Sequence, residues 1–141
     1  MSQKVLTPTI VGRYTTDLRV KLTHSASNNT IITDAPVDNK GKGQAFSPTD
    51  LVAGALVGCI LTVIGIRAEE NNFTIGSPEF SVNKIMQSDP RKIKKIEIKI
   101  IFNEEFSELQ KRIISRAVTT CPVALSLDPS IEQDVQITYN N

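Results

Sequence analysis

Apolar and polar residues alternate most clearly in the second half of the chain. Isoleucine or phenylalanine occupies every even position from 96 to 102, whereas lysine or glutamate occupies positions 95, 97 and 99. Successive side chains of a strand point to opposite faces, so this pattern predicts a strand with one buried and one solvent-facing side. Shorter β-branched runs predict five more strands, with a turn over residues 12–17 between the first two. They cover residues 5–11, 18–23, 30–33, 79–86 and 131–139.

Two segments have the signals of helices. Ser47 and Pro48 form a helix start, with Ser47 as the N-cap, and the helix is expected to run to about Asn71. Residues 107–120 show apolar side chains at helical spacing, and Pro122 ends or kinks that second helix. The resulting order, β-β-β-α-β-β-α-β, predicts an α+β fold, and the length of 141 residues predicts one domain over residues 1–141.

The first helix has an apolar middle on every face. Residues 51–66 carry no charge over 66 − 51 + 1 = 16 positions, which is below the roughly 18–20 needed to cross a bilayer. We therefore expect a buried helix and no membrane partner. Gly54 and Gly58, four residues apart, allow another backbone to approach closely. One small sheet covers one side only, so a second copy of the chain is expected to cover the rest, as a homodimer.

Composition excludes several classes of partner. Lys+Arg total 16 and Asp+Glu total 15, and the net charge of +1 gives no global attraction to nucleic acid or anionic lipid. The N-terminal residues lack the apolar stretch of a secretory signal, which predicts a cytoplasmic protein with reduced thiols. His24 is the only histidine and has no cysteine nearby in sequence, so we expect no metal site.

Cys59 and Cys121 are the groups best suited to covalent chemistry. Cys59 lies within the apolar helix, and Cys121 ends the second predicted helix. If the fold brings them together, they form a dithiol pair. The simpler alternative is that both are buried small hydrophobic residues, which is the usual role of unpaired cysteine. A free thiol with a pKa near 8.5 is only about 3% ionised at pH 7, so a reactive Cys59 needs a nearby cation.

Several motifs together resemble those of the OsmC/Ohr family, the osmotically inducible and organic hydroperoxide resistance proteins. They are the segment from Phe46 to Leu51, the Ala/Gly-rich helix that reaches Cys59, and the run Cys121-Pro122-Val123. The segment 33–36, Thr-Asp-Ala-Pro, looks like a less characterised OsmC-like branch. The resemblance implies an intertwined α+β homodimer, with antiparallel sheets around a long buried central helix and two active sites at the subunit interface.

The resemblance also implies a reaction. It makes Cys59 the thiolate that attacks an organic hydroperoxide and Cys121 the resolving thiol. The resulting Cys59–Cys121 disulfide would be transient and reset by an external dithiol, and no metal or organic cofactor is required. The implied activity is that of a cysteine-based hydroperoxide reductase in oxidative stress.

The resemblance leaves the identity of two further site residues undecided. The family uses an arginine from its N-terminal strands, which in this sequence is Arg19 or Arg13. It also uses a glutamate directly after the helix-opening proline, where this chain has Thr49, with the acid one place later as Asp50. Arg19 is alternatively a surface residue of a strand, and Asp50 a carboxylate that stabilises the helix start.

The departure at Thr49 keeps a second function open. A non-enzymatic dimeric binding protein would hold a small apolar or thiol-bearing ligand at the subunit interface. An unactivated Cys59 would favour this function, and an activated one would favour the enzyme.

Overall fold

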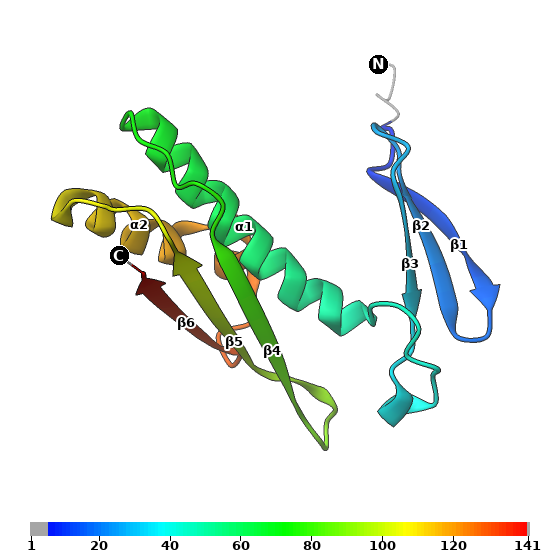
Figure 1. Cartoon of the computed structure of the whole chain (residues 1–141). Coiled ribbons are helices and arrows are strands. Elements are labelled where there is room, and N and C mark those ends of the chain that lie inside the picture. The colour runs from blue at the N-terminus through cyan, green and yellow to red at the C-terminus, as the bar shows by residue number, and fades with distance from the viewer. Residues whose placement is uncertain (1–5, 141) are drawn as a thin grey trace, which may run out of the picture. The chain divides into compact units, whose positions relative to one another are not determined.

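The computed structural model describes residues 6–140, and the chain folds as two compact units, residues 1–51 and 52–141. The α+β class and the predicted order of elements are confirmed (Figure 1). One short helix, α3, follows the second predicted helix. The elements are β1 (Ile10–Thr16), β2 (Arg19–His24), β3 (Thr30–Asp34), the short 3₁₀ helix η1 (Val37–Asn39), α1 (Pro48–Glu70), β4 (Glu79–Gln87), β5 (Lys92–Phe102), α2 (Glu108–Thr120), α3 (Pro122–Ser126) and β6 (Glu132–Tyr139).

In the first unit, β1, β2 and β3 form an antiparallel sheet in that order. The predicted turn over residues 12–17 is wrong, because β1 continues to Thr16 and the chain reverses at Asp17 and Leu18. Both turn residues have positive φ, 52° and 63°, as tight hairpin turns require. Gly12 lies inside β1, where a Cβ would be 2.0 Å from the Lys21 carbonyl oxygen, so this glycine allows close strand approach. Residue 5, the predicted strand start, lies outside the described residues.

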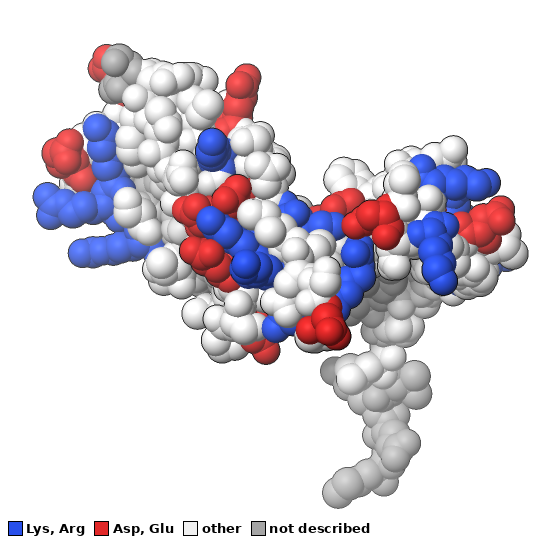
Figure 2. All heavy atoms as spheres, turned by 90° about the horizontal axis from the view of Figure 1, so that it is seen from below, with Lys and Arg blue, Asp and Glu red and all other residues white. Residues whose placement is uncertain are grey.

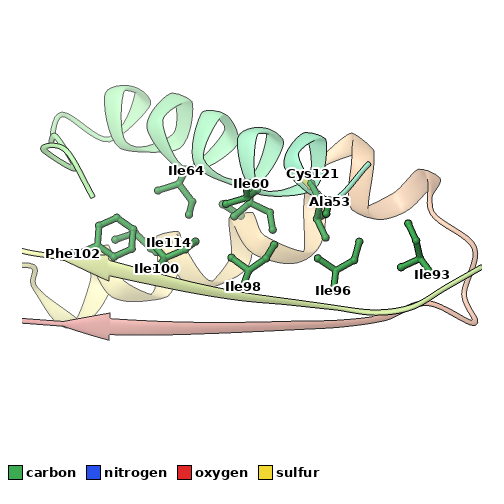
Figure 3. Close-up of a cluster of buried hydrophobic side chains, with 13 residues drawn as sticks. Ala53, Ile60, Ile64, Ile93, Ile96, Ile98, Ile100, Phe102, Ile114 and Cys121 are labelled. Carbon is green, nitrogen blue, oxygen red and sulfur yellow. The ribbon is translucent and has the colours of Figure 1, made fainter. Parts of the chain in front are cut away.

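In the second unit, α1 and α2 cover one face of the sheet β4-β5-β6 (Figures 1 and 3). The predicted buried face of the alternating strand is confirmed, since its four even-numbered side chains are all 0% exposed. They pack against Leu56, Ile60 and Ile64 of α1 and Ile114 of α2. This cluster is the hydrophobic core, and its apolar burial is the main stabilising contribution in the unit.

Strand β5 begins three residues earlier than predicted because it contains a bulge. Ile85 pairs with Lys95 and Met86 with Ile93, which leaves Lys94 as an extra residue. The bulge reverses the alternation, so Ile93 and Ile96 are both buried. The wholly antiparallel arrangement is wrong for one pair of strands, since β6 runs parallel to β5. The connection through α2 and α3 is long enough to return the chain to the start of β5, as a parallel pair requires.

Helix α1 buries one side in the core and exposes much of the rest in the single chain. Leu56, Ile60 and Ile64 are 0% exposed, whereas a Cβ added at Gly54 or Gly58 would meet nothing within 4 Å. By length and composition alone this helix could cross a membrane, a test that the core helices of globular proteins also pass. Its contacts with the isoleucines of β5 show that one face of α1 packs in the hydrophobic core.

Candidate functional site

The two cysteines come together within the second unit. Cys59 lies in the middle of α1 and is partly exposed, whereas Cys121 is fully buried, and both are free thiols. Cys59 packs against the core cluster that contains Cys121, and its thiol lies near enough to the Cys121 thiol to raise the pKa of Cys121. The two cysteines are 62 residues apart in sequence (121 − 59), and the fold brings them near each other because α1 and α2 lie on one face of the sheet (Figure 3).

Cys121 occupies a defined position between two helices. It follows the last residue of α2 and is the N-cap of α3, where its Sγ accepts a hydrogen bond from the Ala124 N–H at 3.2 Å. Pro122 stands at the first position of α3, where its missing N–H costs nothing. The proline therefore begins a new short helix directly after Cys121.

The environments of the two sulfurs differ. Burial raises the pKa of the Cys121 thiol above its ordinary value, and the neighbouring Cys59 thiol raises it further, against the Ala124 N–H, which lowers it. Cys121 is therefore held as a neutral thiol at neutral pH. Of the two cysteines, Cys59 is the one that is partly exposed.

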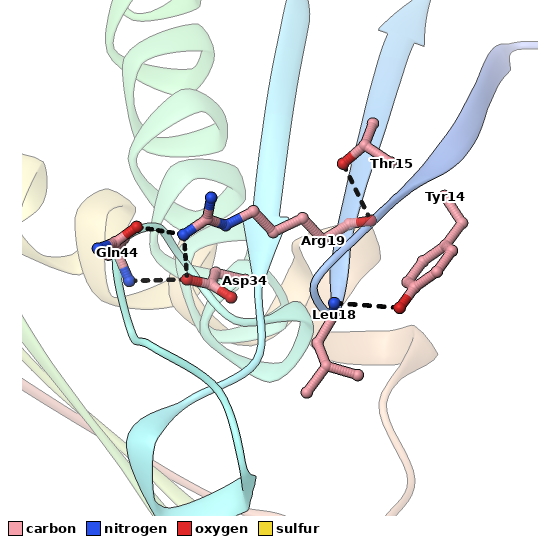
Figure 4. A network of polar contacts seen from close by, with 6 residues as sticks. All are labelled: Tyr14, Thr15, Leu18, Arg19, Asp34 and Gln44. Atoms are coloured by element: carbon pink, nitrogen blue, oxygen red, sulfur yellow. Dashed lines mark hydrogen bonds and ion pairs between the residues drawn. The ribbon is translucent and has the colours of Figure 1, made fainter.

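Arg19 lies in the first unit, at the first residue of β2, and its cross-strand partner in β3 is Asp34. Its Nη2 is 3.5 Å from Asp34 Oδ2 and also donates to Gln44 Oε1 (Figure 4). The Gln44 backbone N–H donates to the same Asp34 oxygen at 2.9 Å. The side chain of Asp34 is 0% exposed and that of Arg19 is 29% exposed, so a buried carboxylate holds a partly accessible guanidinium.

The Asp34 carboxylate is ionised under ordinary conditions. The Gln44 N–H holds the pKa of Asp34 below its usual value; burial opposes this effect, and the charge of Arg19 adds to it. Sequence reasoning did not select Asp34 or Gln44. The signal was the register of the β2–β3 hairpin: pairing Thr23 with Thr30 places Arg19 opposite Asp34.

The other predicted site residues have local roles in the structure. Arg13 is an exposed residue of β1. Asp50 Oδ2 accepts from the Ser47 N–H at 2.9 Å, and the Asp50 N–H donates to Ser47 Oγ at 3.1 Å, which is a reciprocal capping box at the start of α1. Thr49 Oγ1 lies 3.2 Å from the same Ser47 hydroxyl. The structure therefore accounts for Asp50 as a helix-start carboxylate.

His24, the histidine of the chain, lies in the first unit. The Nδ1 of His24 is 2.7 Å from Ser27 Oγ in the turn after β2. Among residues 6–140, no group of three or more His, Cys, Asp and Glu side chains is arranged to hold a metal ion.

On the face that Figure 2 shows, acidic and basic side chains are intermixed, with no large patch of single charge.

Fold and cysteines together define the class of protein: an α+β chain whose long apolar helix carries a thiol in contact with a second, buried thiol. The chain belongs to the OsmC-like protein family, whose sequence profile matches residues 41–136. No match was found among curated proteins.

Solved structures agree with this assignment. A protein from Psychrobacter arcticus 273-4, named for osmotic stress induction and a detoxification response, is 45% identical over 97% of this chain and 99% of its own, with a TM-score of 0.90. An OsmC-like protein from Mycoplasma pneumoniae shares the fold at 18% identity over the whole of both chains, with a TM-score of 0.78. The organic hydroperoxide resistance protein OhrB of Bacillus subtilis shares it at 16% identity, with a TM-score of 0.69 over 95% of this chain and 99% of its own.

Proposed function

We propose that this protein is a thiol-dependent peroxidase that reduces organic hydroperoxides through Cys59 and Cys121. The observation that carries the proposal is the contact between a partly exposed thiol on α1 and a buried thiol whose pKa is raised. The names of relatives support it, since the Bacillus subtilis protein is an organic hydroperoxide resistance protein and the Psychrobacter arcticus protein is named for detoxification.

The reaction uses both sulfurs in turn. The Cys59 thiolate attacks one peroxide oxygen, the O–O bond breaks, and the leaving alkoxide takes a proton to become an alcohol. Cys59 is then a sulfenic acid. The Cys121 thiol displaces water from it and forms a disulfide, which prevents oxidation to the irreversible sulfinic acid. An external dithiol reduces the disulfide by exchange and returns both thiols.

The thiolate needs a positive partner, and Arg19 is the proposed one. Moving a thiol from a pKa of about 8.5 to about 6 takes roughly 3.4 kcal/mol of preferential stabilisation of the anion. A close guanidinium in a site with little water is able to supply this amount. Arg19 is the candidate, rather than Arg13, because Asp34 and Gln44 hold its guanidinium in one orientation.

A homodimer is part of the proposal. The first unit is a three-stranded sheet with many exposed apolar side chains, and small sheets need cover to be stable. Much of α1 is exposed as well. Sedimentation equilibrium should give twice the chain mass of 15.5 kDa, and a monomer across the micromolar range would refute this part. The exposed apolar residues of the sheet include Ile10, Val11, Tyr14, Ile31 and Ile32.

The test is consumption of cumene hydroperoxide with an excess of dithiol. The wild-type protein should turn over, and Cys59→Ser should abolish turnover because it removes the nucleophile. Cys121→Ser should react once and then accumulate sulfinic acid on Cys59. Turnover that survives in the Cys59→Ser variant would contradict the assigned roles.

A non-enzymatic binding protein is the second candidate. One observation favours it, a hollow of about 380 Å³ in the first unit, which has a largely apolar lining that includes Ile10, Leu22 and Ile31. Binding of a small apolar fluorophore without any consumption of hydroperoxide would support this function over the peroxidase.

A further inference from the structure

A hollow of about 330 Å³ lies beside Cys121 in the second unit. Its lining comes from α2, α3 and β6, through Val118, Thr119, Ala124, Gln133 and Val135. Ala124 is the residue whose N–H donates to Cys121 Sγ at 3.2 Å, so one hydrogen bond separates the wall of the hollow from the sulfur. None of these lining residues belongs to α1, the helix that carries Cys59. The hollow therefore adjoins Cys121 without a wall from the helix of the other thiol.

The lining fits a small uncharged molecule. Its apolar side chains come from two valines and Ala124, its polar ones from Thr119 and Gln133, and none of the described residues that line it is charged. Ligand pockets begin at about 300 Å³, so this volume suffices for a small molecule. Cys121 itself is 0% exposed, so a molecule in the hollow reaches its sulfur only when Ala124 moves aside.

Two side-chain bonds hold α3, the helix that contains Ala124. Cys121 Sγ caps its N-terminus, and Gln133 Nε2 donates to the Ala124 carbonyl oxygen at 3.0 Å, which ties the helix to β6. At five residues, α3 is too short to be stable through its own hydrogen bonds. A Cys59–Cys121 disulfide would bring the two sulfurs to bonding distance and draw Cys121 Sγ toward α1, which weakens the cap. Oxidation of the pair therefore loosens the residue that covers Cys121.

The chemistry of the disulfide favours attack at Cys121. In thiol–disulfide exchange a thiolate attacks one sulfur and the other sulfur leaves, and a thiol of lower pKa leaves faster. Burial raises the pKa of Cys121, whereas the proposed reaction requires a Cys59 that ionises readily. Cys59 is therefore the better leaving group, which directs the attacking thiolate to the Cys121 sulfur.

We propose that the hollow bordered by α2, α3 and β6 binds the reductant, a small uncharged dithiol, which attacks Cys121 and releases Cys59. A thiolate of the dithiol forms a bond to Cys121 Sγ, the Cys59–Cys121 bond breaks, and its electron pair stays on Cys59 as the thiolate. The second thiolate of the dithiol then displaces Cys121 from the mixed disulfide, and the dithiol ends as a cyclic disulfide. One of its two protons goes to Cys121 and the other to solvent. The inference rests on the proposed peroxidase function and adds a second site to it.

The first experiment identifies the sulfur that the reductant attacks. The pair is oxidised with diamide, which forms the disulfide without a hydroperoxide, and is then mixed with 2-mercaptoethanol, an uncharged monothiol, and quenched in acid. Peptide mass spectrometry should find the mixed disulfide on Cys121 and the free thiol on Cys59. The opposite assignment would overturn the inference and leave the peroxidase proposal intact.

The second experiment separates oxidation from reduction with matched substitutions. Thr119→Phe fills the hollow from an exposed position of α2, and the control Thr74→Phe places the same ring at an exposed position beside a different hollow of the same unit. Gln133→Leu removes the bond that ties α3 to β6. Each variant is oxidised with one equivalent of cumene hydroperoxide and then reduced with dithiothreitol, and thiol counts in acid-quenched samples give the rate of each step.

Filling the hollow and loosening α3 should change the reduction rate in opposite directions. Thr119→Phe should slow reduction about tenfold, which corresponds to a loss of about 1.4 kcal/mol in binding. Gln133→Leu should speed reduction by roughly two- to tenfold, because one hydrogen bond stabilises the closed position of α3 by about that factor. The oxidation rate should stay the same in both variants, and Thr74→Phe should match the wild-type protein in both steps.

The outcomes separate this inference from the function on which it rests. Equal reduction rates in Thr119→Phe and Thr74→Phe would overturn the inference alone. A wild-type protein that forms the disulfide with diamide but consumes no hydroperoxide refutes the proposed peroxidase, and the reduction step is still measured after diamide. If Thr119→Phe fails to fold, as judged by circular dichroism, the position of the mixed disulfide in the wild-type protein decides the question.

Discussion

Cys121 has a structural role that can be separated from its redox role by the choice of substitution. Its Sγ caps α3 through the Ala124 N–H at 3.2 Å, and its side chain is 0% exposed in the core. Cys121→Ala removes both contributions. Loss of an N-cap costs about 0.5–2 kcal/mol, and loss of a buried group of about methylene size costs about 0.8 kcal/mol. Together these predict a loss of about 1.3–2.8 kcal/mol in the free energy of unfolding.

Cys121→Ser should keep the cap, because a serine hydroxyl accepts the same Ala124 bond. Its expected cost is below about 1.5 kcal/mol, arising from a buried hydroxyl, although the redox function is lost as in Cys121→Ala. Cys59→Ala, at the partly exposed position on α1, is the control and should cost less than about 1 kcal/mol, since alanine is the best helix former.

The assay is urea unfolding followed by circular dichroism, under reducing conditions and at one protein concentration for every variant. A fixed concentration is needed because association with a second chain would change the midpoint. If Cys121→Ser is as unstable as Cys121→Ala or less stable, the Ala124 bond contributes nothing measurable, and the capping argument for this thiol fails.

Three further outcomes follow from the fold. Ile98→Ala should lower the free energy of unfolding by about 2–5 kcal/mol in urea titrations, because Ile98 is 0% exposed in the core; a cost below 1 kcal/mol would show a site that collapses freely. Ser47→Ala should lower the free energy of unfolding by about 0.5–2 kcal/mol, and the thermal midpoint with it, because it removes the acceptor of the Asp50 N–H; an unchanged midpoint would contradict the role of Ser47 as the helix cap. Since the Gln44 N–H lowers the native pKa of Asp34, this carboxylate contributes stability above its unfolded pKa of about 4 that is lost as the pH falls through its native pKa. The difference in thermal midpoint between wild type and Asp34→Asn should therefore shrink from pH 7 to pH 3, and an unchanged difference would contradict the lowered pKa of Asp34.

Much of the fold could be predicted from the sequence where the signals are local. Alternation over residues 95–102 identified the buried face of β5, and Ser47 with Pro48 marked the start of α1 within a residue. The first turn was misplaced because Gly12 suggested a turn, whereas it serves close strand approach inside β1. The direction of β6 was missed because strand pairing depends on the path of the connection, which residue pattern does not specify.

The candidate site was predicted in part for a related reason. Cysteine is rare and chemically distinctive in this chain, so Cys59 and Cys121 could be selected from the sequence alone. Their contact depends on both helices lying on one face of the sheet, which is a tertiary property. Asp34 was missed because burial, rather than residue type, makes it unusual, although counting the hairpin register would have placed it opposite Arg19.

The pairing of Cys59 with Cys121 is tested most directly by adding one equivalent of cumene hydroperoxide to the reduced protein, counting thiols and mapping the disulfide by peptide mass spectrometry. The proposed reaction predicts the loss of two thiols per chain and a single cross-linked product that joins the Cys59 and Cys121 peptides. Retention of both thiols, or a disulfide that joins Cys59 to Cys59 of another chain, would contradict it.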